Sequence, residues 1–272
     1  MSDGATGGGA NLNADTTAST RHGVILLLAA VMPPMAIISL VPVLPLLLEE
    51  FASVKGSEFL VPIAMTVPAL CVALFSPVAG WLSDRVGRKN LLILALVIYA
   101  AIGVVPFFLS DLEQIIAARV GLGVAEAIIM TIATALIGDY FSGKERLRWV
   151  GRQIATVSLS AIVLIALGGI LGQAIGSRGP FLLYLLALPV ALSAAIILFE
   201  PARSTDHAKQ NNESLPLARI LPILIATLFV GIVFYTMIVK LGEILGLTAT
   251  VSPAQIGAIG AGANIGVAVG SV

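Results

Sequence analysis

Two charged residues, Arg119 and Glu126, lie inside a stretch from Gln114 to Gly138 that is otherwise apolar. An ionised side chain at the centre of a bilayer costs at least about 2.5–3.5 kcal/mol, so such residues are candidates for a functional site by default. Their spacing of seven positions is two turns of an α-helix, which places both on one helical face, roughly 10 Å apart along the axis.

This pair allows two interpretations. In the functional one, Glu126 takes up and releases a proton or binds a cationic substrate, while Arg119 holds an anionic group or sets the charge state of Glu126. In the structural one, the two side chains belong to a buried polar network that only joins helices. The sequence leaves both open.

Other chemistry is not indicated. The single cysteine, Cys71, excludes an intrachain disulfide framework and a thiolate metal cluster, and no group of His, Cys, Asp and Glu has the spacing of metal ligands. A nucleophile–base pair within an apolar stretch is also missing. We therefore expect no enzyme activity, no metal and no cofactor.

The composition shows what surrounds these residues. Of the 272 residues, 58% are hydrophobic and only 11% are charged, whereas soluble domains carry about 25% charged residues. Fifteen basic and fifteen acidic residues cancel, which excludes a basic surface for nucleic acid. The chain is therefore predicted to be an all-α, multi-pass membrane protein in contact with the lipid bilayer.

About 20 apolar residues of helix cross a bilayer. Seven full spans and an eighth that reaches the last residue are predicted, at Gly23–Leu48, Phe59–Ser83, Asn90–Ser110, Gln114–Gly138, Gln153–Ser177, Gly179–Phe199, Ile220–Val239 and Ser252–Val272. If the N-terminus is cytoplasmic, eleven of the fifteen Lys and Arg residues lie on the cytoplasmic side and three on the other. This asymmetry predicts a plasma (inner) membrane protein with a cytoplasmic N-terminus.

Prolines are concentrated in the first predicted span, which contains Pro33, Pro34, Pro42 and Pro45. Proline lacks the backbone N–H that a helix needs, so these residues are expected to kink the span and to free backbone carbonyls.

The loop after the second span reads Gly80, Trp81, Leu82, Ser83, Asp84, Arg85, Val86, Gly87, Arg88 and Lys89. This loop resembles the signature loop of the major facilitator superfamily. Gly80 allows a neighbouring helix to approach closely, and Gly87 allows a turn with positive φ. The four charged residues of the loop form a compact latch at the cytoplasmic face.

Two further stretches strengthen the resemblance. Arg119 to Ala127 is similar to the arginine-plus-glycine pattern of the family's fourth helix, and Gly138-Asp139-Tyr140-Phe141, with Arg146 beyond it, is similar to the loop that follows. The resemblance implies that Asp139 pairs with the Arg85/Arg88 cluster and that Arg146 belongs to the same latch. In the fifth span, Gly168, Gly169 and Gly172 form a row of small residues that permits close helix packing.

The resemblance implies a six-helix N-terminal bundle plus the first two helices of a C-terminal bundle. The predicted parts are a disordered cytoplasmic tail (1–21), the six-helix bundle (22–200), a cytoplasmic linker (201–217) and the start of the second bundle (218–272). Superfamily members usually have twelve helices, so the chain is expected to be truncated.

The function implied is secondary active transport: proton-coupled export of a small organic, drug-like molecule by alternating access. Efflux antiporters of the family often carry a Gly-Pro…Gly-Gly motif in the fifth helix, of which Gly168-Gly169 fits the end but Leu164-Ile165 departs from the start. Uptake by proton symport and a truncated, non-transporting membrane protein are the alternatives. The proton gradient is the expected energy source, and a monomer is expected for the full-length form.

Overall fold

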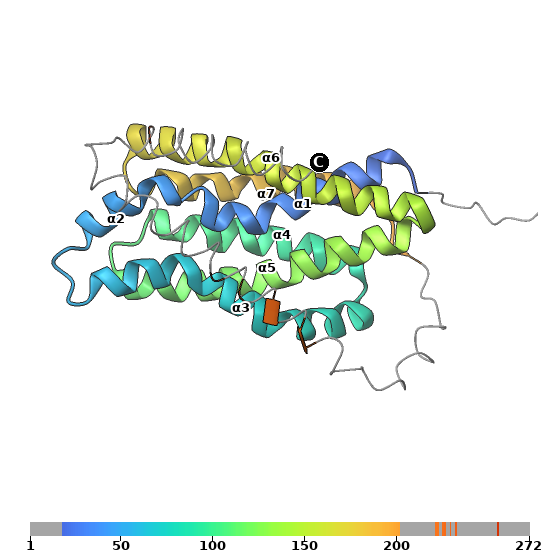
Figure 1. Ribbon diagram of the computed structural model, residues 1–272, viewed down its shortest axis with the longest axis horizontal. Coiled ribbons are helices and arrows are strands. Elements are labelled where there is room, and N and C mark those ends of the chain that lie inside the picture. The colour runs from blue at the N-terminus through green and yellow to red at the C-terminus, as the bar shows by residue number, and fades with distance from the viewer. Residues whose placement is uncertain are drawn as a thin grey trace, which may run out of the picture.

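The computed structural model describes residues 18–201 and a few isolated residues beyond them: Leu221, Pro222, Ile225, Ala226, Phe229, Ile232 and Gln255. Within these residues, six helical spans are long and apolar enough to cross a membrane, and they lie side by side in one elongated bundle (Figure 1). The predicted tail, most of the linker and the two predicted spans after it lie outside the described residues.

The six spans follow one another through short connections. They are α1 (Thr20–Ile38) with η1 (Val41–Val43) and α2 (Leu44–Glu50), α3 (Ser57–Val86), α4 (Arg88–Val104) with η2 (Val105–Phe107), α5 (Leu112–Tyr140), α6 (Gly143–Ile175), and η3 (Gly179–Leu186) with α7 (Ala187–Ile197). Helix α1 begins at Thr20, one residue before the predicted end of the tail, because the Ser19 backbone N–H donates to His22 Nδ1 at 2.9 Å and closes the first turn.

The expected kink in the first span is confirmed as a full break between α1 and η1. The Leu40 N–H donates to the Ile37 carbonyl at 3.1 Å and not to Ala36, four residues earlier, as a regular α-helix would have it. Pro42 and Pro45 are the second residues of η1 and α2, within the first turn, where a missing N–H costs nothing. The Ala36 carbonyl is thereby left without a partner in its own helix.

Helix α5 lies at the centre of the packing, in contact with α1, α3, α4 and α6. Its closest approach is to α3, where a Cβ built on Gly123 would lie 2.6 Å from the Cβ of Cys71 and 2.7 Å from the Cα of Pro68. Large apolar side chains on the outer faces of α3 and α6, such as Leu74 and Leu159, are exposed. An exposed apolar face of this kind suits a lipid environment.

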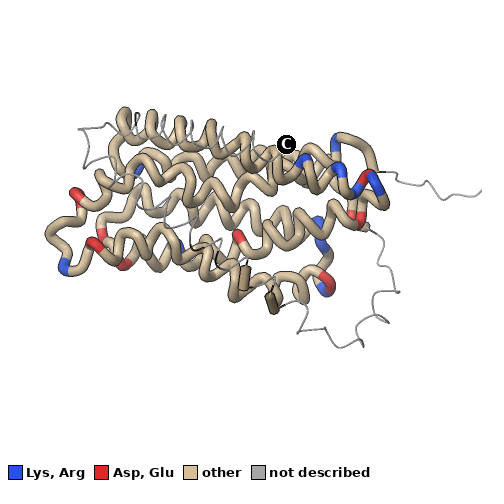
Figure 2. The backbone as a smooth tube through the Cα atoms, in the orientation of Figure 1, with Lys and Arg blue, Asp and Glu red and all other residues tan. Residues whose placement is uncertain are grey.

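Charged residues lie mainly at the two ends of the bundle, and Lys and Arg gather most strongly at one of them (Figure 2). At the opposite end, Glu50 at the end of α2 accepts hydrogen bonds from the Ser177 hydroxyl and from Arg178. The middle of the bundle is nearly free of charge, apart from residues of α5 that are described below.

Helix α6 crosses the break of the first span at Gly168. A Cβ on this residue would lie 2.0 Å from the carbonyl oxygen of Ser39, which is closer than any real side-chain carbon can come. Gly169 and Gly172 are also buried on this face. Within this row, Gly168 makes the close contact, with the irregular backbone at Ser39.

Replacing Gly168 with Ala should destabilise the bundle by about 1–3 kcal/mol, because the added methyl group forces α6 away from Ser39. Gly151→Ala is the matched control on the same helix, since a Cβ there meets no described atom within 4 Å. That control should be neutral or stabilising by up to about 1 kcal/mol, from helix propensity alone. Thermal unfolding of both purified variants in detergent tests the difference, and equal melting temperatures would contradict the packing argument.

Candidate functional site

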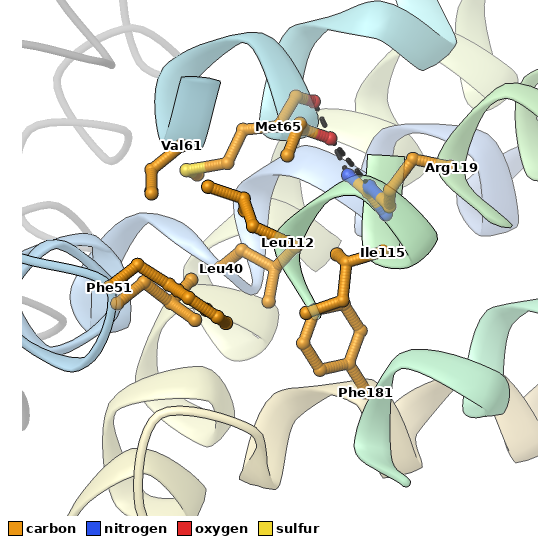
Figure 3. Close-up of a pocket in the computed structure, with 10 residues that line it drawn as sticks. Leu40, Phe51, Val61, Met65, Leu112, Ile115, Arg119 and Phe181 are labelled. Carbon is orange, nitrogen blue, oxygen red and sulfur yellow. Dashed lines mark hydrogen bonds between the residues drawn. The ribbon is translucent and has the colours of Figure 1, made fainter. Parts of the chain in front are cut away.

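Arg119 of α5 is 1% exposed, and its guanidinium group is surrounded by backbone oxygens. Nε donates to the Ala64 carbonyl at 2.9 Å, while Nη2 donates to the carbonyls of Ala36 at 2.8 Å and Met65 at 3.3 Å. Nη1 donates to the hydroxyl of Tyr184. Figure 3 shows the side chain directed at the backbone of α3. Arg119 has no ion pair among the described residues, so neutral dipoles compensate its charge.

These carbonyls are available because two helices are interrupted. In α3, the N–H that would bind the Ala64 carbonyl belongs to position 68, which is proline, and proline has no N–H. In the first span, the break releases the Ala36 carbonyl in the same way. The guanidinium group therefore occupies the place of two missing helix donors, and it satisfies buried acceptors that would otherwise cost about 1–3 kcal/mol each.

Two tyrosines extend the network to α4 and to the sixth span. The Tyr184 hydroxyl, in η3, donates to the Ala36 carbonyl at 3.0 Å. Its ring lies 5.2 Å from that of Tyr99 in α4, edge to face, and the Tyr99 hydroxyl donates to the Met32 carbonyl. Gly103 leaves room for Tyr184, since a Cβ there would lie 2.4 Å from the Cγ of that ring. Four of the six spans thus meet at Arg119, and Tyr99 adds a fifth through its ring contact with Tyr184. This arrangement favours the structural interpretation for Arg119.

Glu126, two turns further along α5, is 3% exposed. Its Oε1 has no hydrogen-bond partner among the described residues. It is also missing from the three ion pairs found there, so Arg119 and Glu126 do not form a salt bridge. A buried polar atom without a partner is rare in a native structure and requires an explanation.

A small pocket lies beside Arg119, with a volume of about 20 Å³ and therefore room for about one water molecule. Arg119 is its single charged lining residue, and Figure 3 shows the apolar side chains around it. It is lined by Leu40, Leu47, Phe51, Val61, Ala64, Met65, Leu112, Ile115, Arg119 and Phe181. The pocket is too small for an organic substrate, so we do not identify it as a transport cavity.

The second cluster is the predicted latch, at the end of the bundle. Arg88 binds two carboxylates at once: its Nη1 lies 2.6 Å from both oxygens of Asp139, and its Nη2 lies 3.0 Å from Oδ1 of Asp84. The expected pairing of Asp139 with the Arg85/Arg88 cluster is therefore present, through Arg88. Gly87 has φ = +104°, as the turn requires.

The other latch residues have different contacts. The Arg85 guanidinium lies over the Trp81 ring, 4.0 Å from its centroid. Arg146 packs on Gly138, where a Cβ would be 3.1 Å from its Nη2. The nearest described atom to a Cβ on Gly80 is 3.9 Å away, so the close helix approach expected at Gly80 is not made by the described residues.

One residue of this cluster was missed by the sequence analysis. The carboxylate of Glu200, three residues after α7, accepts the backbone N–H groups of Arg88 and Lys89 at 2.6 and 2.9 Å. A signal was available, because Glu200 is the single charge at the end of the sixth apolar window and directly precedes Pro201. No group of three His, Cys, Asp or Glu residues that could hold a metal occurs in the described part of the chain.

A family model described as Major Facilitator Superfamily matches residues 26–272. The chain belongs to the major facilitator superfamily. It is 27% identical over 188 residues to the class H tetracycline resistance protein of Pasteurella multocida, across 69% of this chain and 46% of that protein. The chain thus spans about half the length of the curated relatives it matches.

Solved structures confirm the superfamily fold. A bacterial homologue of the human lysosomal transporter Spinster, inward-facing and unoccupied, superposes with a TM-score of 0.72 at 18% identity, over 93% of this chain and 62% of that one. A D-xylose-proton symporter superposes with a TM-score of 0.70 at 14% identity, over 92% and 65% of the two chains. The expected all-α bundle of superfamily type is therefore confirmed.

The Arg119 network makes a direct prediction about stability. Arg119→Met should destabilise the bundle by about 1–3 kcal/mol, because it leaves the buried Ala64 carbonyl without a donor and removes one of the two donors to the Ala36 carbonyl. Arg119→Lys should recover little of this loss, since a single ammonium group cannot reach acceptors on both α1 and α3. The measurement is thermal unfolding in detergent, with the exposed Arg148→Lys as control. A melting temperature for Arg119→Met equal to that of the control would disprove the structural role.

Proposed function

We propose that this protein is a secondary active transporter that couples proton movement to the export of a small organic molecule by alternating access. The observation that carries the proposal is Glu126, a buried carboxyl group whose Oε1 has no hydrogen-bond partner among the described residues, in a chain of this superfamily. The proton gradient is the proposed energy source, and the protein is proposed to act as a transporter and not as an enzyme.

Glu126 fits a proton carrier because nothing described around it holds its charge. An isolated carboxylate in a low-dielectric interior is far more costly than a neutral carboxyl group. Arg119 makes no hydrogen bond to Glu126, since its donors are directed to carbonyls and to Tyr184, so it offsets this cost only through its charge at a distance. A group in this position gains from binding a proton when the site is closed to water and from releasing it when water enters.

Alternating access also needs a contact that holds one conformation and can be broken. The ion pairs of Arg88 with Asp84 and Asp139 fit that need, because they join α4, α3 and α5 at the end of the bundle, within reach of water. Partly exposed ion pairs contribute little each, on the order of 1 kcal/mol. Such a latch can therefore bias two conformations without fixing either one.

Uptake by proton symport is the second candidate. The likeness to the D-xylose-proton symporter supports it, and the departure of Leu164-Ile165 from the antiporter motif weakens the case for export. The relative named for tetracycline resistance supports export of a drug-like molecule. The two candidates share Glu126 as the coupling residue and differ in the direction of substrate movement relative to the proton.

Glu126→Gln, in the full-length protein reconstituted in liposomes, should abolish transport driven by an imposed pH gradient, because glutamine keeps the shape of the side chain but does not titrate. The exposed Glu145→Gln should transport at the rate of the unmodified protein. Tetracycline probes export and D-xylose probes uptake, in vesicles with the gradient set in each direction. Unchanged gradient-driven transport by Glu126→Gln would rule out the coupling role.

A further inference from the structure

The end of the sixth span is attached to the start of the third. Glu200 Oε1 accepts the Arg88 N–H at 2.6 Å, and Oε2 accepts the Lys89 N–H at 2.9 Å. These are the first two residues of α4, whose N–H groups have no partner within the helix. One carboxylate, 111 positions away from Lys89, therefore caps the helix and lies at the positive end of its dipole.

Gly87 makes this cap possible. It is the residue before α4 and has no side chain to cap the helix itself. A Cβ on Gly87 would lie 3.2 Å from all three atoms of the Glu200 carboxyl group, a tight contact that would shift the carboxylate by a few tenths of an ångström from its position at the N–H groups. The glycine of the signature loop therefore serves two purposes: it permits φ = +104° and it admits Glu200.

The backbone next to Glu200 is fixed by α5. The hydroxyl of Tyr140, the last residue of α5, donates to the Phe199 carbonyl and lies 3.2 Å from the Phe199 nitrogen, whose N–H it accepts. The two rings stack with centroids 4.5 Å apart. Tyr140 directly follows Asp139, which binds the Arg88 side chain. Two segments therefore bind the start of α4. The end of α5 binds the Arg88 side chain through Asp139, and the end of the sixth span binds the Arg88 backbone through Glu200.

We propose that Glu200 is the positioning residue of the latch. By binding the backbone N–H groups of Arg88 and Lys89, it places the Arg88 guanidinium where it can bind Asp84 and Asp139 together. The predicted linker, 201–217, begins at the next residue, so a displacement of the linker start that pulls Glu200 away also loosens these ion pairs. The importance of this for the transport cycle rests on the proposed function, whereas the positioning itself does not.

The first measurement is hydrogen–deuterium exchange of the full chain in lipid nanodiscs, at the amides of Arg88 and Lys89. Glu200→Ala should speed their exchange about tenfold, because it removes both acceptors of the cap. Glu200→Gln should have an intermediate effect, since one amide oxygen can still accept. Glu145→Gln, an exposed acid in the first turn of α6, should leave the exchange unchanged.

The second measurement distinguishes positioning from a merely structural cap. In a double-mutant cycle, the combined fall in melting temperature for Glu200→Ala with Asp139→Asn should be clearly smaller than the sum of the two single effects, because both act through Arg88. Replacing Glu200→Ala by Glu145→Gln in the same cycle should give additive effects. If Glu200→Ala does not fold, the Glu200→Gln variant serves in both measurements.

Unchanged exchange at Arg88 and Lys89 in the Glu200 variants, or additive effects with Asp139→Asn, would overturn the proposal. Both measurements are independent of transport. A negative result for proton coupling at Glu126 therefore leaves this test intact, and a negative result here leaves proton coupling open.

Discussion

The burial of one positive charge without a carboxylate partner organises this bundle. The Arg119 guanidinium has to be hydrogen-bonded in an environment that provides no water, and the surrounding helices supply carbonyls for this by giving up their own hydrogen bonds. Pro68 frees one carbonyl in α3, and the break after Ile38 frees another in the first span. Interruptions that would weaken isolated helices thus become the acceptors that tie these helices to α5.

At the end of the bundle, too, a charged side chain binds backbone groups that have no partner in their own helix, but here the side chain is negative. There the unsatisfied groups are the N–H donors of α4, and the group that satisfies them is the carboxylate of Glu200. In both places a glycine lies at the contact: Gly103 makes room for Tyr184 beside Arg119, and Gly87 lies against the carboxylate of Glu200. Backbone groups that lack a partner within their own helix are therefore central to both networks.

Much of the fold, and part of the cluster around Arg88, could be predicted from local sequence. The six spans, the break in the first span, the turn at Gly87 and the pairing of Asp139 with the arginines of the loop follow from hydropathy, proline chemistry and motif. The partners of Arg119 could not be predicted, because they are backbone oxygens on helices far apart in sequence, made available by proline and a local break. The cap by Glu200 was missed for a similar reason, since it joins two segments 112 positions apart.

The contrast between Arg119 and Glu126 also separates their roles. They lie two turns apart on the same helix and are almost equally buried, so burial alone does not identify the functional residue. Each of the three guanidinium nitrogens of Arg119 donates a hydrogen bond, and these bonds connect four spans, so the packing of the bundle depends on this residue. Glu126 has an unpartnered oxygen and no ion pair among the described residues, so changing its protonation breaks none of the hydrogen bonds found there. A group that is to gain and lose a proton in each cycle has to be one on which the fold does not depend.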